Sequence, residues 1–154
     1  MKIKLAIALA LGAATAAAWA GDVEDQIRFR QSSYSFLSWN TAKIKAQASG
    51  HPETYNKDEV IAAANAIAGV ANSGVFEKLY GAGTDKGTGW KPSRLKPEFF
   101  EKQDEAKEFN ANFIKEANEL QKVAASGDVA AIKTQFGKLG ATCKGCHDLI
   151  RIRE

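Results

Sequence analysis

Cysteine, histidine and methionine are scarce in this chain of 154 residues, which has two Cys, two His and one Met. The two cysteines are Cys143 and Cys146, so no disulfide can join distant parts of the chain. A zinc site built from them would lack a fourth ligand at metal-binding spacing. The single methionine is Met1, so a mature chain that begins later has no thioether side chain.

Neither a strong excess of one charge nor a strand pattern is present. The 21 basic and 18 acidic residues nearly cancel, which argues against a nucleic-acid-binding protein. No segment sustains the period-two alternation of apolar and polar residues that strands show, so no sheet is predicted. The one long apolar run, Leu5 to Ala17, is shorter than the roughly 20 apolar residues that a membrane span needs.

The first twenty residues are typical of a secretory signal peptide. A basic start with Lys2 and Lys4 precedes the apolar run, and Ala18-Trp19-Ala20 forms a small-x-small cleavage site. We therefore expect residues 1–20 to be removed and residues 21–154 to fold as one domain. Loss of the two lysines leaves 19 basic against 18 acidic residues, a net charge of about +1. We expect no membrane attachment after cleavage.

The stretch Cys143-Lys144-Gly145-Cys146-His147 carries the attachment motif for c-type haem, C-x-x-C-H. On a helix, Cys143 and His147 project about 40° apart at about 100° per residue, and Cys146 borders the same face. Two thioethers and one axial imidazole can then reach one porphyrin. The alternatives are a disulfide and a thioredoxin-like redox pair, but the latter belongs to a βαβ setting that is missing here. One motif predicts one covalent haem c per chain.

Four amphipathic helices are predicted, over residues 23–48, 57–79, 97–126 and 129–150. Asp22, Asn56 and Asp128 are the expected N-caps, and Pro97 suits the first turn of the third helix. A glycine-rich stretch over residues 81–96 separates the second and third helices and is either functional or disordered at that length. Apolar stripes on all four helices predict an all-α, antiparallel four-helix bundle that encloses the haem near the last helix. His147 falls on the apolar stripe of that helix, so we expect it to point into the core.

No residue is an obvious sixth ligand for the iron. His51 lies in a polar Gly-His-Pro link, where a solvated side chain is expected, and a lysine ligand would have to be buried as a neutral amine. The simplest inference is five-coordinate iron with an apolar distal face. Tyr34 on the first helix is the candidate to block that face, although an ordinary core aromatic has the same pattern.

For two arginines the sequence leaves two interpretations open, a contact with the haem or its ligand and a surface salt bridge. Arg30 lies on the apolar stripe of the first helix, where an unpaired cation is costly, so a haem propionate or a surface salt bridge is expected as its partner. Arg151 is one turn after His147 and lies either beside the imidazole or in a surface salt bridge.

The chain resembles cytochrome c prime over essentially all of residues 21–154. The resemblance rests on several motifs that accompany C-x-x-C-H near the C-terminus. They are Arg30-Gln31-Ser32, Tyr34-Ser35-Phe36-Leu37, Gly81-x-Gly83-Thr84-Asp85, Lys96-Pro97-Glu98-Phe99-Phe100 and Phe136-Gly137-x-Leu139-Gly140-Ala141-x-Cys143.

The resemblance implies a periplasmic four-helix bundle, usually a homodimer packed through the first helices, with high-spin haem that binds nitric oxide and carbon monoxide. Cys143 and Cys146 match the thioether positions and His147 the axial ligand. Further implied haem neighbours are Arg30 and Gln31 near the propionates, Tyr34 on the distal side, Arg151 beside the proximal histidine and Thr88 in the loop.

Three functions follow from these expectations. The first is a gas-binding haem protein, which the lack of methionine favours over the second, a simple electron carrier of a respiratory chain with unidentified redox partners. The third is a peroxidase-like enzyme, which a distal acid-base histidine would favour, and no such histidine lies on the predicted helices. We therefore expect a binding and electron-transfer protein rather than an enzyme.

Overall fold

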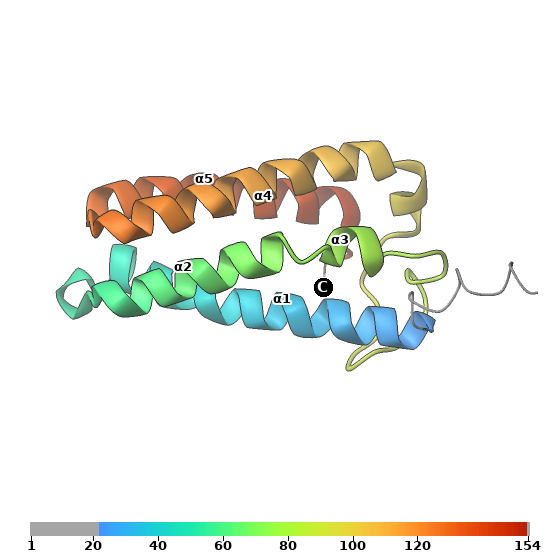
Figure 1. The fold of residues 1–154 in the computed structure, drawn as a ribbon. Coiled ribbons are helices and arrows are strands. Elements are labelled where there is room, and N and C mark those ends of the chain that lie inside the picture. The colour runs from blue at the N-terminus through green and yellow to red at the C-terminus, as the bar shows by residue number, and fades with distance from the viewer. Residues whose placement is uncertain (1–21, 154) are drawn as a thin grey trace, which may run out of the picture.

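The computed structural model describes residues 22–153, so the predicted signal peptide, residues 1–20, lies outside the described residues. Two layers of helices form the molecule (Figure 1). One layer holds α1 and α2, and the other holds α4 and α5. The bounds of the helices are α1 Val23–Lys45, α2 Lys57–Ala71, α3 Val75–Lys78, α4 Gln103–Ser126 and α5 Val129–Ile150.

The predicted antiparallel four-helix bundle is confirmed. Side by side, α1 packs on α2, α2 on α4, and α4 on α5, and the two-residue link between α4 and α5 turns the chain back on itself. Within residues 22–153 no extended strand forms, only two isolated bridges, Thr88 with Pro92 and Leu95 with Arg151. The apolar stripes therefore meet in the way their period required.

Local sequence sets three of the helix starts as predicted. The carboxylate of Asp22 accepts from the Asp25 amide at 2.8 Å, Asn56 accepts from the Glu59 amide at 3.1 Å, and Asp128 accepts from the Ala130 and Ala131 amides. Each cap satisfies amides that the first turn of a helix leaves without a partner. These caps fix where α1, α2 and α5 begin.

The end of the first helix differs slightly from the prediction. Regular α1 ends at Lys45 rather than at Ala48, and the chain continues as a π turn, Ala46–Gly50. The His51 amide closes this turn on the Ala46 carbonyl.

The second helix is shorter than predicted. It ends at Ala71 instead of Leu79, and a turn leads into the single-turn helix α3. Gly74 has φ of 76° in this turn, a left-handed conformation that a glycine adopts without strain. The asparagine before it, Asn72, bonds the Ala68 carbonyl at 2.7 Å and so caps the broken end. Two weak helix formers close together thus end α2.

The third helix also starts later than predicted. Pro97 opens a 3-10 turn, Pro97–Glu101, and regular α4 begins at Gln103. Proline still occupies a first helical position, but the turn it starts is the tighter one. This turn buries Phe99 against the C-terminal end of α5, where the predicted site lies.

One segment, Lys57–Lys78, is long and apolar enough by composition to cross a membrane. The helix is interrupted at Gly74, and the segment contributes Val60, Ala64 and Ile67 to the core shared with α4. We therefore interpret it as a core element of the bundle.

The fourth side of the bundle is the loosely packed one. α1 and α5 contact each other over only a short stretch, whereas the other three neighbouring pairs pack along their length. The loop that follows α3 is ordered and lies along the N-terminal half of α1. The Gly81 amide donates to Gln26 Oε1 at 3.0 Å, and the Trp90 indole donates to Ser32 Oγ at 2.8 Å. The loop thus closes one end of the open side.

Prediction for the loop. Replacing Gly89 with Ala should lower the free energy of unfolding by about 1–3 kcal/mol, the usual cost of overpacking. A Cβ at this position would lie 2.7 Å from the backbone nitrogen and 2.8 Å from the Cα of Arg28, and helix backbone cannot move aside easily. Urea denaturation of the purified protein measures the change.

The matched control is Gly137→Ala in α5, where a Cβ meets no atom within 4 Å. Its higher helix propensity should raise the free energy of unfolding by about 0.5–1 kcal/mol. Equal effects of the two substitutions would contradict the close packing of the loop on α1.

Candidate functional site

The C-terminal turns of α5 present two thiols and an imidazole. Cys143 and Cys146 are free and half-buried, and His147 follows directly. Burial raises the pKa of Cys143, and burial together with the neighbouring Cys143 raises the pKa of Cys146 to about 11. Both thiols are therefore protonated at neutral pH. A redox-active C-x-x-C pair needs the opposite shift, towards thiolate, so this environment disfavours the thioredoxin-like alternative.

Cys146 packs against a buried apolar cluster that also holds aromatic rings from the end of α3 and the 3-10 turn. The ring centroids of Tyr80 and Phe99 lie 5.3 Å apart, and those of Tyr80 and Phe76 lie 5.2 Å apart. These separations are typical of favourable aromatic pairs. The thiols thus project into an apolar, aromatic environment between α1, α3 and α5.

Tyr34 of α1 lies near the same thiols, and its distal position relative to a haem stays a prediction. Burial is the main cause that raises its pKa, and the nearby Cys146 and Cys143 raise it further, whereas its hydrogen bond with Tyr80 and the charge of Arg30 lower it. Burial, followed by interaction with Tyr34, raises the pKa of Tyr80 strongly. Both phenols therefore stay neutral at physiological pH and lie close to the two thiols.

Arg30 is buried, with 6% of its surface exposed, so the surface salt bridge that the sequence left open is wrong. Its Nη1 donates to Leu79 O at 3.0 Å and Thr84 Oγ1 at 3.1 Å, and its Nη2 donates to Thr84 O at 2.9 Å and Ser93 Oγ at 3.0 Å. The guanidinium also lies 4.5 Å from the ring centroid of Tyr80. Desolvation lowers its pKa, and the two tyrosines partly oppose that shift.

Gln31 has a similar structural role. Its Nε2 donates to Lys91 O at 2.8 Å, and its Oε1 accepts from the amides of Trp90 and Lys91. Thr88 is exposed in the same loop and forms an isolated backbone bridge with Pro92. The structure thus shows Arg30 and Gln31 binding the loop, and it does not bring Thr88 to the thiols. Contacts of these three residues with a haem remain predictions.

His147 is exposed, so the prediction that it points into the core is wrong. The 40° offset from Cys143 is enough to move it from the buried face to the edge of α5. It lines a hollow of about 420 Å³ with Arg94, Arg151, Ile152 and Arg153. Partial burial, then the charge of Arg151, lowers the pKa of His147, while Asp148 raises it. The imidazole is thereby favoured in its neutral, metal-binding form.

His51 lies far from this site. It is exposed beside Glu53, with 3.2 Å between its Nδ1 and the carboxylate, as expected for a solvated loop histidine. Lys57, close by, donates to Ser126 O near the start of α5, so this is the end of the bundle where α5 begins. Cys143 is fifteen residues beyond Asp128, about 22 Å along the helix.

These residues fit a covalent haem. Two protonated thiols and an imidazole lie within five residues of α5; Cys146 packs against an apolar, aromatic cluster, and His147 lies exposed at the edge of the same helix. Among residues 22–153, no three His, Cys, Asp or Glu side chains gather to hold a metal ion directly, so the zinc alternative has no support there. A flat ligand held by thioethers suits this arrangement better than a bare ion.

Sequence reasoning missed two residues of the site. Tyr80 is hydrogen-bonded to Tyr34 and lies close to Arg30 and Cys146, and Arg94 lines the hollow beside His147. Each lies more than 45 positions from its partners in the sequence. No local pattern marks them, because only the fold of the loop brings them near α1 and α5.

Comparison with known proteins agrees with this geometry. The family model for cytochrome c′ matches residues 25–151. A cytochrome c′ from Rhodocyclus tenuis is 52% identical over 85% of this chain and 96% of its own length, and one from Allochromatium vinosum is 47% identical over 94% of this chain and 92% of its own. A solved cytochrome c′ described as having ligand-controlled dimer dissociation is 46% identical, with a TM-score of 0.79, and covers 85% of this chain and 97% of its own.

Prediction for the arginine. Replacing Arg30 with Met should lower the free energy of unfolding by about 2–4 kcal/mol, because buried acceptors on the loop lose their charged donor. Amide hydrogen exchange over residues 79–93 should become faster. The control is Lys107→Met, which removes an exposed pair with Asp104 on α4 and should leave the free energy of unfolding and the exchange of the loop nearly unchanged. Unchanged exchange in the loop of the Arg30 variant would show that other contacts hold it.

Proposed function

The chain belongs to the cytochrome c′ family, and from that premise we propose that it is an exported c-type haem protein whose five-coordinate, high-spin iron binds small gas ligands. Proteins of this family bind haem c. The observation that carries the proposal is the placement of Cys143, Cys146 and His147 on α5, opposite Tyr34 of α1.

The two cysteines would hold one haem per chain. Each S–H adds across one vinyl C=C bond, with the sulfur and the hydrogen on neighbouring carbons, so no group leaves and no oxidant is needed. The raised thiol pKa values keep both sulfurs protonated before attachment and unreactive toward disulfide formation. His147, neutral and at the edge of the same face, would be the axial ligand. When bound, the haem supplies an iron centre that takes up diatomic ligands and changes oxidation state.

The proposed five-coordinate iron rests on what lies opposite α5. Tyr34 and Tyr80 are neutral phenols, and the mature sequence has no methionine. His51, the other histidine, lies at the far end of the bundle. Tyr34 therefore limits access to the distal side instead of binding the iron. Nitric oxide and carbon monoxide, which bind ferrous haem strongly, can displace such a ring, whereas water and weak anions cannot.

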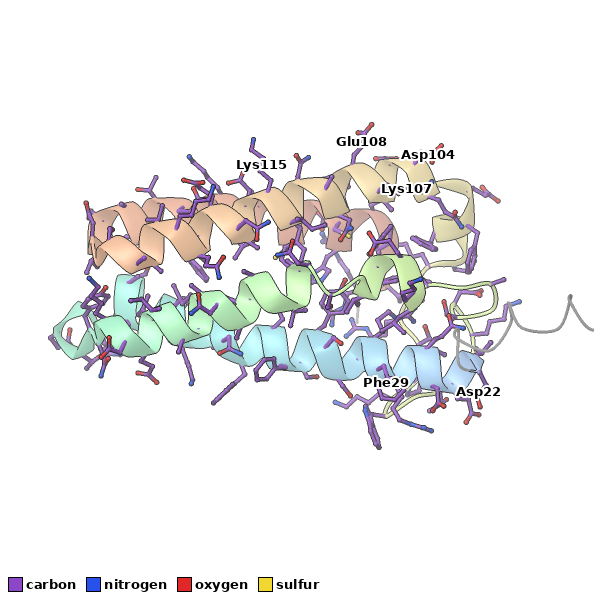
Figure 2. The ribbon with its side chains drawn as sticks, viewed as in Figure 1. Asp22, Phe29, Asp104, Lys107, Glu108 and Lys115 are labelled. Carbon is purple, nitrogen blue, oxygen red and sulfur yellow. The ribbon has the colours of Figure 1, made fainter. Side chains whose placement is uncertain are left out.

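A homodimer through the first helix is part of the proposal. The outer side of α1 exposes aromatic side chains, among them Phe29 with 57%, Phe36 with 48% and Trp39 with 56% of their surface exposed. Phe29 projects from α1 on the side away from α4 and α5 (Figure 2). An aromatic stripe at helical spacing on a soluble protein favours association. We propose a second copy of α1 as the occupant; the 46%-identical structure is described as a dimer that dissociates under ligand control.

We further propose that residues 1–20 direct export to the periplasm, where c-type haem is attached. Electron transfer with unidentified redox partners is the second candidate function, and the exposed position of His147 favours it, because this edge of the site is open to solvent. We propose no enzymatic reaction. Phenols with raised pKa values are poor general bases, and a peroxidase-like reaction needs acid-base help on the distal side.

Prediction for the cofactor. Mass spectrometry of the denatured protein, made in a host that attaches haem, should show the chain plus one haem. Absorption and electron paramagnetic resonance spectra should be high-spin in the ferric protein, and His51→Ala should leave them unchanged. A bare polypeptide mass would contradict covalent attachment. A fully low-spin spectrum would favour the electron carrier over the gas-binding protein.

Prediction for the distal side. Tyr34→Ala should raise the association rate and the affinity of ferrous haem for carbon monoxide, because the ring no longer has to be displaced. Flash photolysis measures the rate, and sedimentation with and without carbon monoxide measures the dimer. Since Tyr34 lies on the helix that we propose forms the dimer, the substitution should also weaken any link between ligand binding and dissociation.

The control for this experiment is Phe36→Ala, on the exposed side of the same helix. It should weaken the dimer and leave carbon monoxide kinetics within about twofold of the unmodified protein. Unchanged kinetics in Tyr34→Ala would mean that Tyr34 is only a core aromatic.

A further inference from the structure

We propose that the face around His147 is a docking surface for an acidic partner protein that exchanges electrons with the haem, an inference that rests on the proposed haem function. The face is defined by two segments, residues 94–96 and 144–153, which the fold brings together. The Lys96 amide donates to Ile150 O at 2.8 Å, and the Ile152 amide donates to Arg94 O at 2.9 Å.

Positive charge is concentrated on this face. The two segments hold five cations and one carboxylate, Asp148, and Glu154 next along the chain makes two carboxylates. The cations are Arg94, Lys96, Lys144, Arg151 and Arg153. The rest of residues 21–154 then has 14 basic and 16 acidic residues, a slight negative excess, although the whole is close to neutral. A nearly neutral protein with one positive face has a directional field that orients an approaching partner.

Hydrogen bonds hold several of these cations in place. Arg94 donates from Nη2 to Ile152 O at 2.8 Å, and Lys96 donates from Nζ to Asp148 O at 2.8 Å. Asp148 pairs with both Lys144 and Arg153. Fixed side chains lose less conformational entropy when a partner binds. The face is therefore pre-organised.

A structural role accounts for only part of this arrangement. Cations near a helix C-terminus interact favourably with its dipole, and Lys96 contacts the last carbonyls of α5 in this way. Those bonds go to neutral carbonyl groups, so the charge of the lysine is not cancelled by them. Arg151 is exposed and lines the same hollow as His147. The positive charge thus lies beside the proposed iron ligand.

The position on the fold decides what kind of partner this face fits. Within the attachment motif, Lys144 and His147 are exposed, whereas Cys143, Gly145 and Cys146 are partly buried, so the site meets solvent on the His147 side. A partner docked on these arginines would place its own redox centre close to the proposed haem. The positive arginines attract a partner with negative surface charge, so the partner that this face fits is an acidic protein surface.

The test compares two double variants of the haem-loaded protein that lose the same charge. The docking variant is Arg151→Gln with Arg153→Gln, which keeps the bonds between Arg94 and Ile152. The control is Lys115→Gln with Lys122→Gln, whose side chains are 77% and 74% exposed on α4. Lys115 lies on the outer side of α4, away from this face (Figure 2).

Two oxidants of opposite charge measure the electron-transfer rate of the ferrous protein. With anionic hexacyanoferrate(III), the docking variant should react about five- to tenfold more slowly than the unmodified protein at about 10 mM ionic strength, and the difference should vanish near about 0.5 M. With the cationic tris(phenanthroline)cobalt(III), the docking variant should react faster. The control should stay within about twofold with both oxidants.

A readout without redox chemistry accompanies the rates. On a carboxylate cation-exchange column, the docking variant should elute at lower salt than the control of equal net charge. Equal elution and equal rates for the two variants would overturn the proposal. Specific slowing of the hexacyanoferrate reaction by inorganic phosphate at constant ionic strength would reveal a small-anion pocket and would also overturn it. If neither oxidant reacts with the protein at all, the haem function fails instead, and the column result still stands alone.

Discussion

The arrangement of the site depends on one buried cation. The guanidinium of Arg30 has no carboxylate partner among its contacts within residues 22–153. Its charge is stabilised by carbonyl and hydroxyl oxygens of Leu79, Thr84 and Ser93 and by the ring of Tyr80. Burying a charge is costly unless its donors are satisfied, so the loop has one favoured position over α1. That position carries Tyr80 to Tyr34 and directs the chain toward the strand-like contact of Leu95 with Arg151. The same cation thus places the distal phenols and, through the chain that follows, the C-terminal face.

The loosely packed side of the bundle, between α1 and α5, is the second constraint on the site. Three pairs of helices pack closely, and alanines on α2 and α4 allow that approach, whereas α1 and α5 contact each other over only a short stretch. The proposed porphyrin, held by thioethers, would add apolar surface to the contact between α1 and α5 and could not dissociate. The bundle, whose cysteines form no disulfide, would then gain packing from the haem.

Much of this could be predicted from local sequence. The caps at Asp22, Asn56 and Asp128 and the apolar stripes act within a few residues, so they fixed the helix starts and the bundle. The break at Gly74 was harder to foresee, since one glycine costs only about 1 kcal/mol and tertiary contacts decide the outcome. The partners of Arg30 could not be predicted, because Thr84 and Ser93 lie 54 and 63 residues away in sequence. The exposure of His147 was not predicted. A position 40° around the helix from Cys143 still belongs to the apolar stripe, but it lies at the edge of the stripe, where the side chain meets solvent.

The two sides of the proposed haem face different physical environments, and this bears on how one protein can bind gas and transfer electrons. On the α1 side, neutral phenols and apolar rings exclude charge and water, so only ligands with strong bonds to iron gain enough to enter. On the His147 side, arginines and solvent surround the axial ligand and stabilise negative charge nearby. A ligand on the first side changes the iron, and the second side is where a partner would detect that change. Because α1 also carries the exposed aromatic stripe, distal binding could act on association while electron transfer continues through the opposite face. The two proposed functions therefore need not compete for one surface, and a single haem would be able to serve both.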